Sequence, residues 1–298
     1  MKRNSILFVG CGDIGIRTGA QLLASGWEVG GVRRDSAALP EGFTAFAADY
    51  ALPGSLDFAA AWQPDYVVAS FNPSDRSEQG YHRGFTLAAR NLLAGLGEHR
   101  PRALFMISST RVFAEREGGW VNEDSALARD DPRAQAIIAA EQLLLDSPQR
   151  ACVLRFAGIY GAPGSRLLAK IRRGQVAPAE PLRYGNRIHR EDCAGVILHL
   201  LERSEAGLEL APVYLGVDDL PAPRAEVERW LATRLGLGPQ LDQPADDLEL
   251  APGMPANSGN KRCSNRLLTA SGYRLIHPDY RSGYEALLAA ENAGSAGT

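Results

Sequence analysis

Short apolar runs alternate along the first half of the chain with longer amphipathic segments. The apolar runs, typical of buried β-strands, lie at residues 5–9, 27–32, 44–48, 64–71, 103–107 and 151–156. Segments with a helical spacing of apolar residues lie between them, most clearly at 14–24, 80–97 and 134–145. Strands that alternate with helices at this rhythm form βαβ units. The pattern therefore predicts an α/β fold with a doubly wound parallel sheet.

The first apolar run ends in a glycine cluster with the spacing G-x-G-x-x-G. In this context the first glycine permits a tight turn, the second lets the backbone approach a pyrophosphate, and the third lets the helix pack close to the strand. The start of the helix offers free N–H groups to the same anion. An ordinary strand-to-helix turn is the alternative, but the flanking elements favour a Rossmann-type dinucleotide site. The residues expected there are Gly10, Gly12, Asp13, Ile14 and Gly15.

Two arginines, Arg33 and Arg34, follow the second predicted strand, where such a fold meets the adenosine ribose. An acidic residue at this place accepts hydrogen bonds from the 2′-hydroxyl of NAD, whereas arginine binds the 2′-phosphate of NADP. The pair therefore predicts NADP as the cofactor. NAD is the alternative, because Asp35 follows directly. A solvated pair of loop charges is the other interpretation of these arginines.

Two further strand ends carry polar residues that can reach a cofactor. Asp49 and Tyr50 follow the third strand, where a carboxylate either contacts the adenine amino group or caps the next turn. Ser70 lies near the end of the fourth strand, just before an Asn-Pro turn. We interpret Tyr81 and Arg83, near the start of the next helix, as surface residues.

The fifth strand ends in hydroxyl residues, among them Ser108 and Ser109, on the edge where nicotinamide and substrate are expected to meet. Capping of a turn is the alternative role for these hydroxyls. After the sixth strand the alternation becomes irregular and Pro and Gly become frequent, which predicts a smaller lobe. We therefore expect a dinucleotide-binding domain over residues 1–158, completed by about 187–218, a substrate-binding lobe over 159–292 and a disordered tail over 293–298.

Charge and composition narrow the class of protein. The formal net charge of −3 gives no basic footprint for nucleic acid, and no apolar run approaches the roughly 20 residues of a membrane span. The N-terminal residues lack the features of a signal peptide. The four cysteines are scattered without a Cys-x-x-Cys pair, so no metal site is expected. We expect a cytoplasmic protein with a small-molecule substrate, no nucleic-acid or membrane partner, and a homodimer as the default assembly.

Several motifs spread along the chain carry a family resemblance. Besides the glycine loop, residues 108–113 are similar to a Ser-Ser-x-x-Val-Tyr run of one family, and residues 154–161 to its Leu-Arg-x-x-x-x-Tyr-Gly-Pro segment. Residues 186–194 are similar to the His-x-x-Asp-x-Ala stretch of the same family. Residues 260–265 and 272–284 are similar to the C-terminal end of its atypical members. In this order they resemble the extended short-chain dehydrogenases/reductases, the group of NAD-dependent epimerases and dehydratases, and especially its atypical members. The resemblance implies a Rossmann fold with a smaller C-terminal substrate-binding lobe.

One departure concerns the catalytic Tyr-x-x-x-Lys pair of that family. There the phenol acts as acid and base, the lysine lowers its pKa, and a glutamate follows four residues after the lysine. Counted back from Glu141, the resemblance places Ile137 at the lysine position and Arg133 at the tyrosine position. Isoleucine carries no charge and arginine stays protonated, so neither side chain can replace its counterpart. The usual catalytic pair is absent.

Other residues must then carry any chemistry. The candidate catalytic residues are Ser108, Ser109 and Tyr160, and Tyr160 has packing of the lobe junction as its alternative role. The candidates for binding an anionic substrate are Arg133, Arg187, His189 and Lys261, with surface charge, or a structural role for His189, as alternatives.

The sequence predicts an NADP-dependent oxidoreductase or epimerase that acts on a sugar-nucleotide-like or other small carbonyl or hydroxyl substrate. A catalytically weak NADP(H)-binding redox sensor or regulatory protein is the alternative. A protein that binds a nucleotide sugar without catalysis is a third hypothesis.

Overall fold

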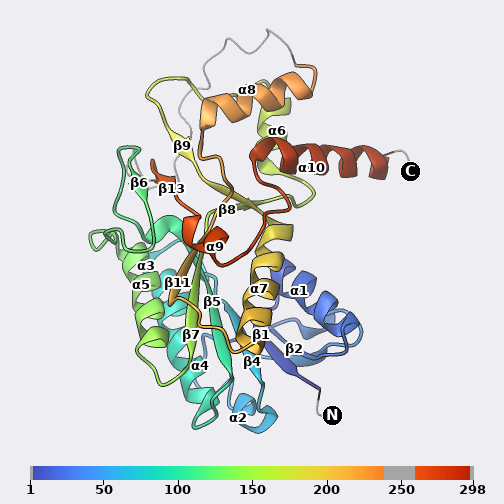
Figure 1. Cartoon of the computed structure of the whole chain (residues 1–298), viewed down its shortest axis with the longest axis vertical. Coiled ribbons are helices and arrows are strands. Elements are labelled where there is room, and N and C mark those ends of the chain that lie inside the picture. The colour runs from blue at the N-terminus through green and yellow to red at the C-terminus, as the bar shows by residue number, and fades with distance from the viewer. Residues whose placement is uncertain (1–2, 238–258, 296–298) are drawn as a thin grey trace. The chain divides into compact units, whose positions relative to one another are not determined.

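The computed structural model describes residues 3–237 and 259–295 (Figure 1). The chain divides into two compact units. Unit 1 comprises Met1–Ala114, Leu127–Phe156 and Cys193–Gly216, and unit 2 comprises Glu115–Ala126, Ala157–Asp192 and Val217–Thr298. The predicted loop at 238–260 lies outside the described residues up to 258.

A seven-stranded parallel sheet forms the centre of unit 1. Its strands are β1 (Ser5–Val9), β2 (Glu28–Arg33), β3 (Thr44–Ala47), β4 (Tyr66–Ser70), β5 (Ala103–Ser109), β7 (Ala151–Phe156) and β11 (Val213–Gly216). They are ordered β11-β7-β5-β4-β1-β2-β3, and every pairing is parallel. The chain therefore winds outward from β1 in both directions. The predicted doubly wound Rossmann sheet is confirmed.

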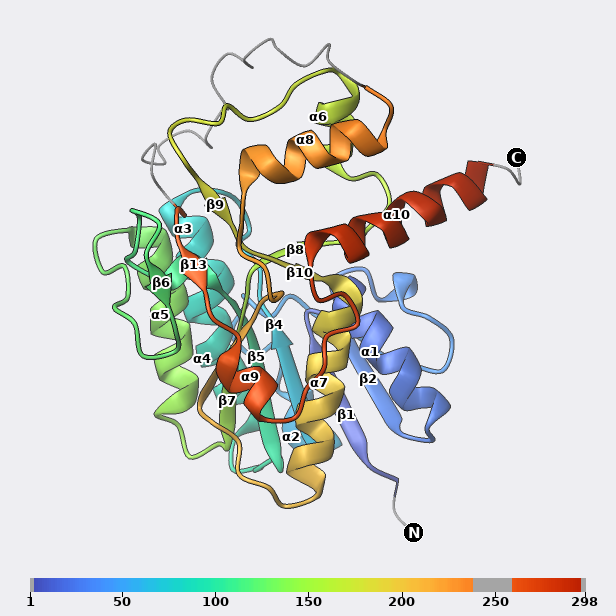
Figure 2. The same cartoon turned by 45° about the horizontal axis from the view of Figure 1, so that its top comes forward.

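Helices cover both faces of this sheet, as Figures 1 and 2 show. The main ones are α1 (Asp13–Ala24), α4 (Ala88–Leu96), α5 (Pro132–Leu145) and α7 (Arg190–Glu205), which crosses the unit boundary in sequence. Shorter elements are η1 (Ser36–Ala38), α2 (Phe58–Trp62), α3 (Glu78–Tyr81) and η3 (Thr110–Val112). The central strands β1, β4, β5 and β7 are buried because helices cover both faces, which explains their continuous apolar runs, whereas the edge strand β3 is largely exposed. No helix in the described residues is both long and apolar enough to cross a membrane.

The helix predicted at 80–97 contains a change of winding. Its central turn, η2 (His82–Leu87), is a π-helix between α3 and α4. Gly84 lies in this turn, and a Cβ there would come 2.2 Å from the Asn72 carbonyl oxygen. The absence of a side chain at Gly84 therefore lets the turn approach the loop that follows β4.

Unit 2 contains short strand pairs and a helical core. The strands β8 (Gly158–Tyr160) and β10 (Arg187–His189) pair in parallel, as do β6 (Trp120–Val121) and β13 (Arg262–Cys263), whereas β9 (Tyr184–Gly185) and β12 (Ala222–Pro223) are antiparallel. Its helices are α6 (Arg166–Arg172), α8 (Arg224–Arg234), α9 (Arg266–Ala270) and α10 (Tyr280–Ser295). Apolar side chains of α6, α8 and α10 form the core of this unit.

Two boundaries differ from the sequence expectation. Residues 115–126 belong to unit 2, because β6 pairs with β13 near the C-terminus, whereas the expected dinucleotide domain ran to 158. The tail expected at 293–298 begins inside α10, which continues to Ser295, and residues 296–298 lie outside the described residues. The first difference was not visible in local periodicity, because a strand of two residues such as β6 carries no period.

Candidate functional site

A cavity of about 440 Å³ opens at the carboxyl ends of four neighbouring strands of unit 1. Its walls come from the segments that follow β1, β2, β3 and β4, and from the π-helix η2. The lining residues that concern us are Gly10, Cys11, Gly12, Arg33, Arg34, Asp35, Asp49, Tyr50, Asn72 and Arg83. We call this cavity the carboxyl-edge pocket. Parallel α/β sheets bind their ligands at this edge.

The glycines of the first turn have three different environments. Gly10 has φ +83°, and a Cβ there would come 2.2 Å from the Ser70 carbonyl oxygen, so this position accepts only glycine. At Gly15 a Cβ would lie 3.3 Å from Phe8 Cδ1, which reflects close packing of α1 on β1. At Gly12 the nearest atom is 4.0 Å away, so the space in front of the loop is open. This cradle fits the phosphates of a dinucleotide.

The N-terminus of α1 supports the same fit. Gly12 is the N-cap, and no side-chain hydrogen bond from the described residues caps this end of the helix. The first backbone N–H groups are therefore available to an anion. Asp13 and Ile14 begin the helix but do not line the carboxyl-edge pocket, and neither does Ser70. Their contacts with a cofactor stay predictions.

Three arginines line the carboxyl-edge pocket. Arg33 is the last residue of β2 and is half-buried, and the exposed Arg34 follows it. The third, Arg83, comes from η2. None of the three makes a hydrogen bond or an ion pair with a described residue. Guanidinium groups gathered around one cavity attract a phosphate, although Asp35 and Asp49 line the same cavity.

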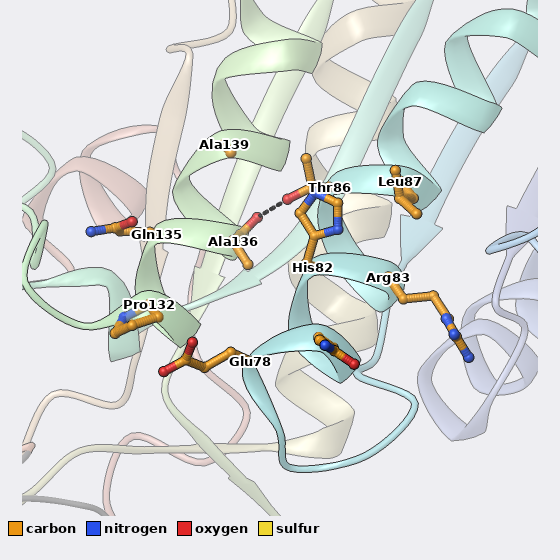
Figure 3. Close-up of a pocket in the computed structure, with 10 residues that line it drawn as sticks. Glu78, His82, Arg83, Thr86, Leu87, Pro132, Gln135, Ala136 and Ala139 are labelled. Atoms are coloured by element: carbon orange, nitrogen blue, oxygen red, sulfur yellow. Dashed lines mark hydrogen bonds between the residues drawn. The ribbon is translucent and has the colours of Figure 1, made fainter.

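Arg83 is exposed, as expected for a surface residue, and it also lines the carboxyl-edge pocket. A second cavity, of about 620 Å³, lies between η2 and α5, where Thr86 Oγ1 donates a hydrogen bond to the Ala136 carbonyl oxygen at 3.0 Å. Figure 3 shows the Arg83 side chain extending away from α5 rather than toward it. From there Arg83 reaches the wall of the carboxyl-edge pocket, together with Gly84. Sequence periodicity could not reveal this placement, because it cannot distinguish a π-turn from an α-turn.

Asp49 and Tyr50 lie in the wall of the same pocket. Asp49 Oδ1 accepts a hydrogen bond from the Ala51 N–H at 3.0 Å, which is the turn-capping role considered above. The Tyr50 hydroxyl accepts one from the Asn72 N–H at 3.1 Å and so joins the loops after β3 and β4. Burial raises the pKa of Tyr50, so this phenol stays protonated and its hydrogen remains available as a donor.

The face of α5 that the resemblance singles out points into unit 1. Glu141 forms a buried ion pair with Arg155 of β7 and accepts a hydrogen bond from Ser108. Ile137, one turn earlier, is 1% exposed. Arg133, one turn earlier again, is half-buried at the start of the helix. Residues spaced by four share a helix face, so Arg133 is the polar end of this row.

Two of the expected catalytic residues have structural partners. The Ser108 hydroxyl donates to Glu141 inside unit 1, which corrects its expected contact with substrate. Tyr160 packs against Tyr284, with ring centroids 4.6 Å apart, and its hydroxyl donates to the Asp279 carbonyl oxygen at 3.4 Å. Burial raises the pKa of Tyr160 far above its usual value, so this phenol is unsuited to proton transfer. Ser109 Oγ accepts the Arg111 N–H at 3.2 Å, which caps η3, and its own hydrogen is not engaged there.

The substrate candidates lie in different units. Arg133 belongs to unit 1, whereas Arg187, His189 and Lys261 belong to unit 2. Lys261 is 4% exposed and lies beside Glu115, whose pKa is lowered by backbone hydrogen bonds and also by this lysine. Arg187 Nη1 donates to the Gly185 carbonyl oxygen at 3.0 Å. The buried placement of Lys261 is a correction to the alternative of plain surface charge, and the burial of His189, 4% exposed, agrees with the structural role considered for it.

Comparisons with known proteins agree with this geometry. The profile of a family described as NAD(P)H-binding matches residues 10–204. No curated protein matches the chain in sequence. A solved structure from Methylobacillus flagellatus, assigned to the NAD-dependent epimerases/dehydratases, is 34% identical, with 98% of this chain and 100% of that chain covered and a TM-score of 0.79.

More distant solved structures share the fold. UDP-glucose 4-epimerase from Thermotoga maritima is 13% identical, with 98% of this chain and 99% of that chain covered and a TM-score of 0.79. The human epimerase family protein SDR39U1 (isoform 2), solved with NADPH, is 20% identical, with 96% and 99% covered and a TM-score of 0.70. With a family profile that spans most of the chain and a relative at 34% identity, the chain belongs to the NAD(P)H-binding family and has the fold of NAD-dependent epimerases and dehydratases.

Proposed function

We propose that the protein binds NADP(H) in preference to NAD(H). The observation that carries this proposal is the set of three arginines, Arg33, Arg34 and Arg83, around one pocket, none of which makes a hydrogen bond or ion pair with a described residue. NADP differs from NAD by its 2′-phosphate, and a cluster of arginines binds the negative charge of this group. Asp35 and Asp49 line the same pocket, but the positive charges outnumber them.

The chemistry that we propose is hydride transfer without the Tyr-x-x-x-Lys pair, as in an oxidoreductase or epimerase. Bound NADP(H) supplies or accepts the hydride. Arg133 holds the substrate oxygen and stabilises the negative charge that develops on it. A guanidinium does not release a proton, so the proton of the product hydroxyl comes from solvent. Ser109, whose hydroxyl hydrogen is not used in its turn cap, is the hydroxyl that we retain as a substrate contact.

A guanidinium at the substrate oxygen suits a small carbonyl or hydroxyl compound. Sugar nucleotides belong among the compounds to test, because a UDP-glucose 4-epimerase shares the fold. We propose a cytoplasmic location, since the four cysteines are buried free thiols, and the homodimer stays a prediction.

A fluorescence titration tests the cofactor proposal. NADPH is expected to bind at least tenfold more tightly than NADH. Arg34→Ala and Arg83→Ala are each expected to weaken NADPH binding by tenfold or more. Arg90→Ala is the matched control, because Arg90 is exposed on α4 and does not line the pocket. NADH binding as tightly as NADPH would refute the preference. An equal loss of affinity for NADPH and NADH in Arg83→Ala would mean that this arginine contacts the pyrophosphate, which both cofactors share.

A second candidate function is a redox sensor that binds NADP(H) with little catalysis. The observation in its favour is Ile137, an apolar residue that is 1% exposed where the family has its lysine. Turnover assays with aldehydes, ketones and sugar nucleotides separate the two candidates. An enzyme is expected to show turnover that falls about 100-fold in Arg133→Ala and recovers partly in Arg133→Lys. The absence of turnover, together with a protein partner that binds only one redox form, would favour the sensor.

A further inference from the structure

Two histidines and a glutamate meet in unit 2, and none of them lines the carboxyl-edge pocket. His189 ends β10, Glu191 lies in the first turn of α7, and His277 lies in the segment before α10. Glu191 Oε2 is 3.1 Å from His277 Nε2 and 3.9 Å from His189 Nδ1. One ligand atom from each residue lies within 4.8 Å of the other two. We call these residues the His-Glu-His cluster.

Both imidazoles are held in place by their surroundings. They are buried, with 4% of His189 and 8% of His277 exposed. His189 Nε2 packs against Gly161, where a Cβ would come 2.1 Å from this nitrogen, so Nδ1 faces the cluster, where it also accepts a long hydrogen bond of 3.4 Å from the Glu191 N–H that an ion would replace. His277 Nδ1 is 3.1 Å from Ser282 Oγ, which leaves Nε2 facing Glu191. Metal-binding histidines commonly have a hydrogen-bond partner on the second nitrogen, as His277 has in Ser282.

A buried carboxylate fixes the segment that carries His277. Asp192, beside Glu191 on α7, accepts hydrogen bonds from the Ile276 N–H at 2.7 Å and the His277 N–H at 3.0 Å. The Tyr273 hydroxyl donates to the same carboxylate at 2.9 Å. The backbone of His277 is therefore anchored to the helix that supplies Glu191. The side chain of Glu191 is 45% exposed, which leaves an entry path from solvent.

We propose that the His-Glu-His cluster binds a divalent transition-metal ion such as Zn²⁺. Imidazole nitrogen and carboxylate oxygen are ligands that Zn²⁺ prefers. With bonds of about 2.0–2.2 Å, the ligand atoms of a tetrahedral ion are roughly 3.3–3.5 Å apart, and the two separations at Glu191 lie on either side of that range. Water completes the coordination on the exposed side. The ion ties the start of α7 to the segment before α10.

This site departs from the expectation of no metal, which depended on the spacing of cysteines. Glu191 and His277 are 86 residues apart in sequence, so no local motif joins them. A hydrogen-bonded His277–Glu191 pair without a metal is the competing description of the same geometry. The two differ in one measurable property, the stoichiometric uptake of an ion.

Calorimetric titration of ZnCl₂ into the untagged full chain, after removal of metals with a chelator, tests the proposal. We expect one Zn²⁺ per chain, with binding weakened at least tenfold in His277→Ala and in Glu191→Gln. His82→Ala is the control, because His82 is exposed on η2 in unit 1 and is expected to bind as wild type. Co²⁺ in place of Zn²⁺ should give visible absorption bands of a low-coordinate site, and these bands should be lost in His277→Ala.

The outcomes are decisive in either direction. Lack of 1:1 binding by the wild-type chain would overturn the proposal, as would unchanged affinity in Glu191→Gln. Equal losses in His82→Ala and His277→Ala would also overturn it, because they would show adventitious binding. If circular dichroism shows that His277→Ala does not fold, Glu191→Gln decides, since its half-exposed side chain is replaced by one of the same shape.

Discussion

Arg155 Nη2 lies 2.7 Å from Glu141 Oε2, and Arg155 Nε lies 3.2 Å from each oxygen of the same carboxylate. The side chains are 5% and 2% exposed, so the pair is screened very little by water. It joins β7 to α5, and Ser108 of β5 donates to the same carboxylate. Glu141 therefore fastens two neighbouring strands of the sheet to the helix that covers them.

We expect Glu141→Gln to destabilise the protein by about 3–5 kcal/mol. Removing one charge from a buried pair leaves the other without compensation, and this costs more than the intact pair gains. The free energy of unfolding in urea, measured by circular dichroism, checks the prediction. Glu98→Gln is the control, because Glu98 is exposed in the same unit.

The paired variant sharpens this prediction. Glu141→Met with Arg155→Met removes both charges and should unfold at a higher urea concentration than either single substitution. Additive losses in the double variant would show that the two side chains do not act as a pair.

Substitutions at two glycines of the first turn, Gly12 and Gly10, should have different effects. Gly12→Ala places a methyl group in open space, 4.0 Å from the nearest atom, so the urea midpoint should stay within experimental error of wild type. The same methyl group occupies the space expected for the pyrophosphate and should weaken NADPH binding at least tenfold. Fluorescence titration of NADPH measures this effect.

Gly10→Ala is the contrasting variant. It forces a non-glycine residue to φ +83° and puts a Cβ 2.2 Å from the Ser70 carbonyl oxygen, so stability should fall by about 1–3 kcal/mol. Wild-type NADPH affinity in Gly12→Ala would contradict the proposed approach of the phosphates to this loop.

The cysteines should be unreactive in the native protein. All four are buried, and burial raises the pKa of Cys11, Cys152 and Cys263 to about 12. At pH 8 only about one thiol in ten thousand is then ionised, and the thiolate is the reactive form. A thiol-reactive dye should titrate four groups rapidly in denaturant and none rapidly without it. Rapid labelling of one native thiol would show an open path to it.

The central sheet was predictable from the sequence because its inner strands are buried on both faces. A strand such as β1 then reads as an unbroken apolar run, and its neighbours follow from the alternation with helices. The polar end of β5 was harder to place. β5 includes the polar Ser108 because the Ser108 hydroxyl donates a hydrogen bond to Glu141 inside the unit. The hydrophobic pattern of the strand alone does not reveal this partner from a helix.

The site was predictable only where local pattern determines it. The glycine turn and Arg33 follow directly from strand ends, so their place in the pocket could be inferred. Arg83 could not, because its reach depends on the π-turn and on Gly84 approaching Asn72. The His-Glu-His cluster also depends on contacts between distant segments. Such contacts arise from tertiary packing rather than from spacing.

Asp218 should make stability depend on pH. Its side chain is 2% exposed, and burial raises its pKa to about 8, although Arg187 opposes this shift. An unfolded aspartate has a pKa near 3.9, so the folded state holds this proton more tightly. The stabilising contribution is therefore complete below about pH 4 and is lost as the pH rises through about 8. Asp218→Asn removes the titration and should flatten the profile.

Urea unfolding at pH 5, 6.5 and 8 measures this difference. From pH 5 to 8 the wild type should lose more than about 1 kcal/mol of unfolding free energy relative to Asp218→Asn, since each pH unit between the two pKa values changes it by up to about 1.4 kcal/mol. Asp124→Asn is the control, because Asp124 is exposed in the same unit and should follow the wild-type profile. Parallel profiles of wild type and Asp218→Asn would mean that the folded protein holds Asp218 ionised, with Arg187 outweighing the effect of burial.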